Sequence, residues 1–129
     1  MPQPADRKYT KEHEWVKFDG NNAVVGITEY AQSSLGDIVY VELPKPGSKV
    51  ERSKPIGVVE SVKAVSDIYA PVSGTVTEVN SAVEDDPAKV NVDPFGDGWL
   101  VKLTLAGAPD GDGLLEATAY DELVNSLSH

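Results

Sequence analysis

A lysine at the tip of a predicted β-hairpin is the residue of this sequence best suited to chemistry. Segments 56–62 and 65–69 are rich in Val, Ile and Tyr, a composition typical of strands, and only Lys63 and Ala64 separate them. A tight hairpin usually has Asn-Gly or Asp-Gly at its tip. A lysine there breaks the local turn rule without an evident structural gain, and such departures are expected at functional sites.

The chemistry that suits Lys63 is modification by another enzyme. A lysine amine that stays protonated at neutral pH is a poor nucleophile, and the small or apolar neighbours Val62 and Ala64 do not predict a buried, activated amine. The alternative interpretation is a solvated turn lysine without a special role, which describes most surface lysines.

Other side chains offer little catalytic chemistry. The chain contains no cysteine, which excludes a disulfide framework, a thiol nucleophile and thiolate metal sites, so redox sulfur would have to come from a cofactor. Its two histidines, His13 and His129, are too few for a histidine metal cluster, and the acidic segment 110–113 lacks the EF-hand pattern. We therefore predict no bound metal and no catalytic residue.

Length and charge limit the remaining possibilities. The 129 residues, 40% of them hydrophobic, predict a single domain that spans residues 1–129. A net charge of −10 disfavours nucleic acid and anionic membranes as partners. The first residues do not resemble a signal or transit peptide, and no window approaches membrane-spanning length, so we expect a cytoplasmic protein or a mature mitochondrial one.

Short strands separated by Gly, Pro and Asp must position the lysine. Besides the two hairpin segments, we predict strands at 15–18, 23–27, 37–43, 74–79 and 99–105. Their spacing of roughly eight to twelve residues is typical of a β-sandwich or flattened barrel.

Few helices are expected. Residues 28–35 can form a short helix with Thr28 as N-cap and Gly36 as its end, and Asp86 is a candidate N-cap in front of Pro87. A terminal helix is predicted at about residues 118–127.

Several segments resemble the glycine cleavage system H-protein family. The segment Glu60-Ser61-Val62-Lys63-Ala64, with residues 66–74 after it, is similar to the lipoyl-lysine segment of that family. Further similar segments are residues 11–16, 25–28, 30–32, 35–39, 41–44, 90–91 and 93–100. The resemblance covers about residues 8–125.

The resemblance implies a fold and a cofactor. The fold would be a barrel-sandwich hybrid, a flattened β-sandwich of the biotinyl/lipoyl-carrier type with short helices and a C-terminal helix. The lipoyl hairpin would span about residues 54–75, with lipoic acid held as an amide on Lys63. The residues expected to guide the modifying enzyme are Glu60, Ser61, Val62, Ala64 and Asp67.

The function implied by the resemblance is that of a non-catalytic carrier. It would shuttle the aminomethyl group of glycine from a pyridoxal-phosphate-dependent glycine decarboxylase to a tetrahydrofolate-dependent aminomethyltransferase. A flavin-dependent dihydrolipoamide dehydrogenase would then reoxidise the carrier, and a lipoylating ligase or transferase would attach the cofactor. We expect a monomer, because several partners must reach one arm.

Glu14 is the second candidate site residue. It matches the Glu of the family's His-Glu-Trp segment, where a carboxylate would hold the ammonium of the aminomethyl cargo. A charge-assisted hydrogen bond of this kind contributes about 1.5 to 3 kcal/mol. The alternative is a solvated carboxylate at the start of a strand.

Related carriers provide the competing interpretations. Biotin carriers flank their lysine with methionines, whereas the only methionine here is Met1. Lipoyl domains of 2-oxo-acid dehydrogenases have an acidic residue immediately before the lysine, where this chain has Val62. A relay protein that donates lipoyl or octanoyl groups to other enzymes would have the same sequence features as an H protein.

Overall fold

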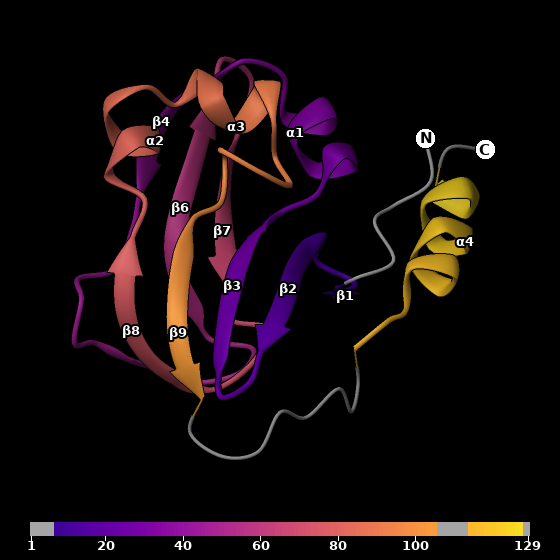
Figure 1. Cartoon of the computed structure of the whole chain (residues 1–129). Coiled ribbons are helices and arrows are strands. Elements are labelled where there is room, and N and C mark those ends of the chain that lie inside the picture. The colour runs from indigo at the N-terminus through magenta and orange to yellow at the C-terminus, as the bar shows by residue number, and fades with distance from the viewer. Residues whose placement is uncertain (1–6, 106–113, 128–129) are drawn as a thin grey trace.

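Two antiparallel sheets packed face to face make up most of the fold, with short helices at one end and a C-terminal helix at the side (Figure 1). The computed structural model describes residues 7–105 and 114–127. The predicted mainly-β fold class with a C-terminal helix is confirmed. Within the described residues, no helix combines the length and apolar character that a membrane span requires.

The larger sheet has six strands and contains the N-terminal hairpin. Its strand order is β1-β2-β3-β9-β8-β5, and every neighbouring pair is antiparallel. The strands are β1 (Lys8–Tyr9), β2 (Glu14–Asp19), β3 (Asn22–Ile27), β5 (Lys49–Val50), β8 (Gly74–Val79) and β9 (Val101–Leu105).

The smaller sheet carries the predicted lysine hairpin. It consists of β4 (Ile38–Glu42), β6 (Pro55–Ser61) and β7 (Val65–Tyr69), with β6 in the centre. Gly57 of β6 lies so close to β4 that a Cβ atom there would be 2.4 Å from the Glu42 carbonyl oxygen. The absence of a side chain at Gly57 allows this close approach, and the antiparallel pairing of β4 with β6 joins the hairpin to its neighbour.

The core lies between the two sheets and is mainly aliphatic. Strand β9 alternates buried with half-buried side chains, as expected when one face of a sheet is covered, whereas β2 and β3 each have three consecutive buried residues at one end. The most buried members include Val16, Val25, Val59, Ile68, Val76, Val101 and Leu103. The hairpin therefore presents its tip to solvent while its inner face is anchored in this core.

The first helix begins and ends where its sequence predicts. Helix α1 spans Glu29–Leu35, and the Thr28 side chain accepts a hydrogen bond from the Ala31 N–H at the N-cap. Gly36 follows with φ of 80°, a conformation that glycine adopts without strain.

The two short helices after β8 were only partly expected. Helix α2 (Ser81–Asp85) was not predicted, and α3 (Ala88–Val92) follows Pro87 as anticipated. The predicted N-cap role of Asp86 is wrong, because Pro87 occupies the N-cap of α3 and no side chain caps it. Asp86 instead ends α2, where its N–H donates to the Ala82 carbonyl.

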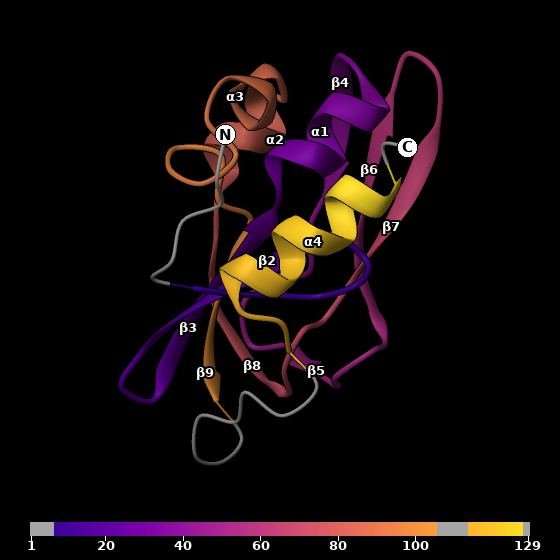
Figure 2. The same cartoon turned by 90° about the vertical axis from the view of Figure 1, so that its right-hand side faces the viewer.

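Helix α4 covers the outer side of the N-terminal strands. It spans Ala117–Leu127, one residue longer at its start than predicted, and lies across β1 and β2 in Figure 2. Tyr120 is fully buried and stacks on Tyr9 with ring centroids 4.9 Å apart. Its hydroxyl contacts His13 Nδ1 at 2.8 Å and Thr28 Oγ1 at 2.7 Å, which ties α4 to the start of α1.

Replacing Tyr120 by Phe is expected to lower the free energy of unfolding by about 1 to 3 kcal/mol, because it leaves the half-buried His13 ring and the buried Thr28 hydroxyl without this partner. Urea denaturation at neutral pH measures the change. Tyr40→Phe is the matched control, since Tyr40 is 47% exposed. Equal stability of both variants would contradict the prediction.

Candidate functional site

The tip of the β6–β7 hairpin is closed by a serine hydroxyl. Ser61 N–H donates to the Ala64 carbonyl at 2.8 Å, and Ser61 Oγ accepts hydrogen bonds from the N–H groups of Lys63 and Ala64 at 3.2 and 3.1 Å. No residue of the tip has a positive φ. A serine side-chain turn therefore replaces the Asn-Gly chemistry that the sequence lacks.

The Lys63 amine projects from this turn into solvent. Val62 N–H donates to the Asp37 carbonyl at 3.1 Å, which ties the tip to the corner between α1 and β4. The Lys63 stem passes Gly36, where an added Cβ would lie 3.3 Å from Lys63 Cε. Among residues 7–105 and 114–127 the amine makes no hydrogen bond or ion pair. A modifying enzyme can therefore approach it.

The five residues expected to guide modification all lie on this hairpin. Glu60 is the second-to-last residue of β6 and lies opposite Val65. Asp67 lies on β7 opposite Val58. Directly opposed residues share a face of the sheet, so the two acidic side chains lie on the same outer face. Val62 and Ala64 are exposed within the tip, whereas Ser61 is half-buried and makes the turn.

Glu14 lies at the start of β2 and is almost completely buried, with 2% of its surface exposed. Its Oε1 accepts a hydrogen bond from Thr10 Oγ1 at 2.7 Å, and its Oε2 accepts one from the Tyr69 N–H at 3.1 Å. The interpretation of Glu14 as a solvated carboxylate is therefore wrong. It connects the loop before β2 with the end of β7.

Burial raises the pKa of Glu14 to about 7. The hydrogen bonds from Thr10 and Tyr69 oppose this shift, and the negative charge of Glu12 adds to it. No cation among the described residues forms an ion pair with the carboxylate. A buried carboxylate without a cationic partner is unfavourable, and such groups cluster at functional sites.

A cavity of about 390 Å³ opens beside Glu14. It lies between the loop before β2, the end of β7 and the turn at residues 52–53. Its lining residues are Thr10, Lys11, Glu12, Glu14, Arg52, Ser53, Tyr69, Ala70, Pro71 and Leu114. The cavity is large enough to admit a small polar group to the Glu14 carboxylate.

Strand β7 connects the two candidate residues without bringing them into contact. Lys63 lies just before β7, and Glu14 binds the N–H of its last residue, Tyr69. Six residues of extended chain span about 20 Å. The backbones of Lys63 and Tyr69 therefore lie about 20 Å apart along β7.

Sequence reasoning missed Thr10 and Tyr69, the two hydrogen-bond donors to Glu14. Tyr69 contributes a backbone N–H, which leaves no signal in its residue type, and the pairing spans 55 residues. His13 provides a further constraint that the sequence did not reveal, because it adopts a φ of 70° beside Glu14.

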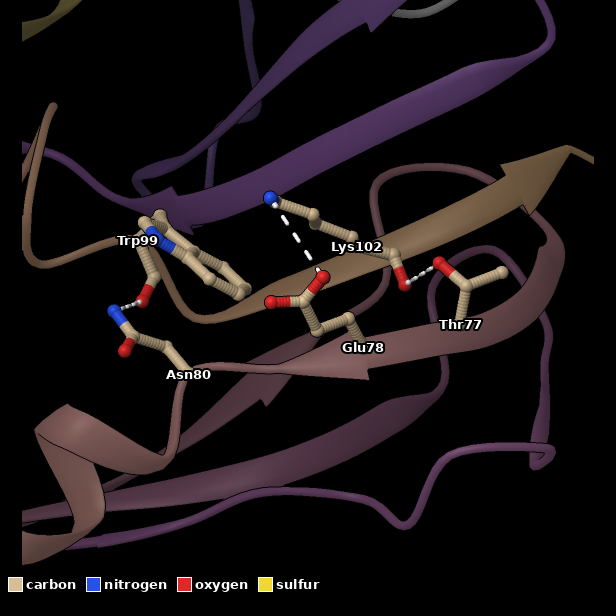
Figure 3. Close-up of polar contacts among 5 residues, drawn as sticks. All are labelled: Thr77, Glu78, Asn80, Trp99 and Lys102. Atoms are coloured by element: carbon tan, nitrogen blue, oxygen red, sulfur yellow. Dashed lines mark hydrogen bonds and ion pairs between the residues drawn. The ribbon is translucent and has the colours of Figure 1, made fainter.

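One further pair of charged side chains, on β8 and β9, forms an ion pair. On β8 and β9, Lys102 Nζ lies 3.8 Å from Glu78 Oε1 and 4.7 Å from the centroid of the Trp99 ring (Figure 3). Within the described chain, no group of three or more His, Cys, Asp and Glu side chains could hold a metal ion. Segment 110–113 and His129 lie outside the described residues.

Comparisons with known proteins agree on one family. The model of the glycine cleavage H-protein family matches residues 7–127. The glycine cleavage system H protein of Herpetosiphon aurantiacus is 57% identical over 122 residues, which cover 95% of this chain and 93% of that protein. The corresponding protein of Acidobacterium capsulatum is 55% identical, with 96% and 95% coverage.

A solved structure supports the same assignment. The crystal structure of a glycine cleavage system H protein from Mycobacterium marinum superimposes with a TM-score of 0.89 at 40% sequence identity. The match covers 95% of this chain and 99% of that one. The hairpin with Lys63 and the strand with Glu14 both lie within the matched family region. This chain therefore belongs to the glycine cleavage H-protein family.

Proposed function

We propose that Lys63 bears a lipoyl group and that the chain is the lipoyl carrier of a glycine cleavage system. The observation that carries the proposal is the exposed Lys63 amine, which makes no bond to the described residues and lies on a turn fixed by Ser61. A rigid turn with a free amine is what an acylating enzyme requires of its substrate. Membership of the H-protein family supports the choice of lipoate.

Attachment needs only the amine of this chain. Lys63 Nζ would form an amide bond with the carboxyl carbon of an activated lipoyl group, with release of the activating group and of the protons that the ammonium loses. The bound group supplies a disulfide that can be reduced to a dithiol, chemistry that a chain without cysteine lacks. Ser61 and the Asp37 carbonyl hold the backbone on which this arm would turn.

Glu14 is proposed to receive the amine of the aminomethyl cargo. Its carboxylate adjoins a cavity and lacks a cationic partner among the described residues, so an ammonium would provide the missing charge. An ammonium beside the carboxylate would also favour its ionised form. The adjacent hydrogen bonds from Thr10 and Tyr69 hold the carboxylate in a fixed orientation.

The outer face of the hairpin is proposed to guide the modifying enzyme. Glu60 and Asp67 supply negative charge on one face, and Val62 and Ala64 supply small apolar contacts on either side of the lysine. Ser61 acts through the turn geometry that it fixes. A lipoylating ligase or transferase with a basic rim would complement this face.

The proposed partners follow from the carrier role. They are the pyridoxal-phosphate-dependent glycine decarboxylase, the tetrahydrofolate-dependent aminomethyltransferase and dihydrolipoamide dehydrogenase. The chain itself is proposed to be a non-catalytic monomer that performs no step of the chemistry. The bacterial relatives support a cytoplasmic location.

The test is the mass of the protein after exposure to lipoate, ATP and a lipoate–protein ligase. We expect a gain of about 190 Da, mapped to the peptide that contains Lys63. A gain of about 225 Da with biotin, ATP and a biotin–protein ligase, together with no mass gain from lipoate, would favour a biotin carrier instead. An unmodified Lys63 in the presence of an active ligase would contradict the proposal.

A further inference from the structure

The Asn91 side chain of α3 binds the backbone on both sides of Asp37. Its Oδ1 accepts a hydrogen bond from the Ile38 N–H at 2.9 Å, and its Nδ2 donates to the Gly36 carbonyl at 2.9 Å. Nδ2 also donates to Gln32 Oε1 at 2.8 Å. One side-chain amide thus uses both of its N–H donors and its oxygen to join α3, α1 and β4.

Asp37 lies between the two residues whose backbone Asn91 binds, and it is hydrogen-bonded to the hairpin tip. Its carbonyl accepts the Val62 N–H at 3.1 Å, and Val62 directly precedes Lys63. Because Asn91 fixes both neighbours of Asp37, it also fixes the direction of this carbonyl. We propose that Asn91 is the positioning residue of the Lys63 tip, an inference that rests on the proposed attachment of lipoate at Lys63.

The chemistry of the three bonds requires an amide at position 91. With the amide reversed, its N–H would face the Ile38 N–H and its oxygen would face the Gly36 carbonyl, so one orientation alone satisfies all partners. Aspartate has the same shape but keeps only the acceptor for Ile38. Its second oxygen would lie against the Gly36 carbonyl, which turns attraction into repulsion.

If segment 36–38 lost its bonds to Asn91, the modifying enzyme would bind the Lys63 tip less well. An enzyme that acylates Lys63 must bind the tip in one conformation, so a smaller fraction of competent tips raises the apparent KM. Once the complex has formed, the same amine reacts, and kcat should stay nearly the same. General destabilisation of the chain does not produce this pattern, provided that the protein remains folded.

Asn80 provides a matched control elsewhere in the fold. Its Nδ2 donates to the Asp97 carbonyl at 2.8 Å and to the Trp99 carbonyl at 2.7 Å, the second of which Figure 3 shows. Asn80→Asp removes two donors from carbonyl acceptors, as Asn91→Asp removes two donors. The bonds of Asn80 involve neither the segment 36–38 nor the hairpin tip.

The experiment measures the Val62 amide and the modification kinetics separately. In Asn91→Asp without lipoate, NMR hydrogen exchange of the Val62 amide should be at least about ten-fold faster than in the parent protein, because its acceptor is released. With lipoate, ATP and a lipoate–protein ligase, the KM for this variant should rise severalfold while kcat changes less than about two-fold. Asn80→Asp should leave both quantities near the parent values.

The outcomes separate this inference from the proposed function. If Asn91→Asp matches Asn80→Asp in Val62 exchange and in KM, the positioning role of Asn91 is overturned. If the parent protein is not lipoylated at all, the proposed function fails, while accelerated Val62 exchange would still establish that Asn91 positions the tip. Asn91→Ala, which removes the three bonds without introducing a charge, provides the same comparison should the aspartate variant not fold.

Discussion

Lys63→Arg is expected to abolish the lipoyl mass gain completely while leaving the fold intact. Arginine keeps the positive charge and a stem of similar length, but its guanidinium stays protonated and does not form the amide. The Lys63 side chain makes no hydrogen bond or ion pair within the described residues, so the exchange removes no such contact. Intact mass after treatment with lipoate, ATP and ligase measures the result.

Lys54→Arg is the matched control for Lys63→Arg. Lys54 is an exposed lysine directly before β6, at the base of the same hairpin. We expect this variant to gain about 190 Da, as the parent protein does. If Lys63→Arg gained the full mass and another lysine peptide carried it, the assignment of the attachment site would be wrong.

Local signals predicted much of the framework around this lysine. The strands of the hairpin and the helix between Thr28 and Gly36 follow from β-branched residues, a hydroxyl N-cap and a glycine at positive φ, all of which act over a few residues. The tip itself also has a local explanation, although a less common one. The Ser61 hydroxyl accepts hydrogen bonds from the N–H groups of Lys63 and Ala64 and so stabilises a turn that contains no glycine.

Features that depend on distant contacts were not predictable. The sequence could not decide between a solvated and a functional Glu14, because its burial depends on Tyr69 and on the wall of the cavity. Helix α2 escaped notice because it is five residues long and has no side-chain cap. The Asn91 contacts likewise join segments more than fifty residues apart, and nothing in the residue type indicates them.

Glu14→Gln is expected to stabilise the protein at pH 8 and to remove a pH dependence of its stability. The pKa of Glu14 is raised from 4.5 to about 7 in the folded state, so folding favours the protonated carboxyl. Its favourable contribution is present below pH 4.5 and is lost as the pH rises through 7. A shift of this size corresponds to about 3 kcal/mol, of which about 2 to 3 kcal/mol falls between pH 5 and 8.

The difference in free energy of unfolding between Glu14→Gln and the parent reports the titration of Glu14 alone. The free energy of unfolding of Glu14→Gln, minus that of the parent, should increase by about 2 to 3 kcal/mol from pH 5 to 8 in urea titrations. Poorer hydrogen bonding of the glutamine to Thr10 and Tyr69 lowers the difference in free energy of unfolding by the same amount at pH 5 and at pH 8, so it does not change this increase. Asp19→Asn, which removes an exposed carboxylate at the other end of β2, is the control. A difference that does not change with pH would contradict the burial of an ionisable Glu14.

The same variant tests why the chain retains an unfavourable group. If the carboxylate holds the ammonium of the cargo, Glu14→Gln should release formaldehyde from the loaded carrier about ten-fold faster, because a charge-assisted hydrogen bond is replaced by a neutral one. The free energy of unfolding at pH 8 would then rise while retention of the cargo falls. Such a trade-off is expected when a residue serves binding at a cost in stability. Unchanged retention together with the predicted rise in stability would assign Glu14 a structural role between the loop before β2 and the end of β7.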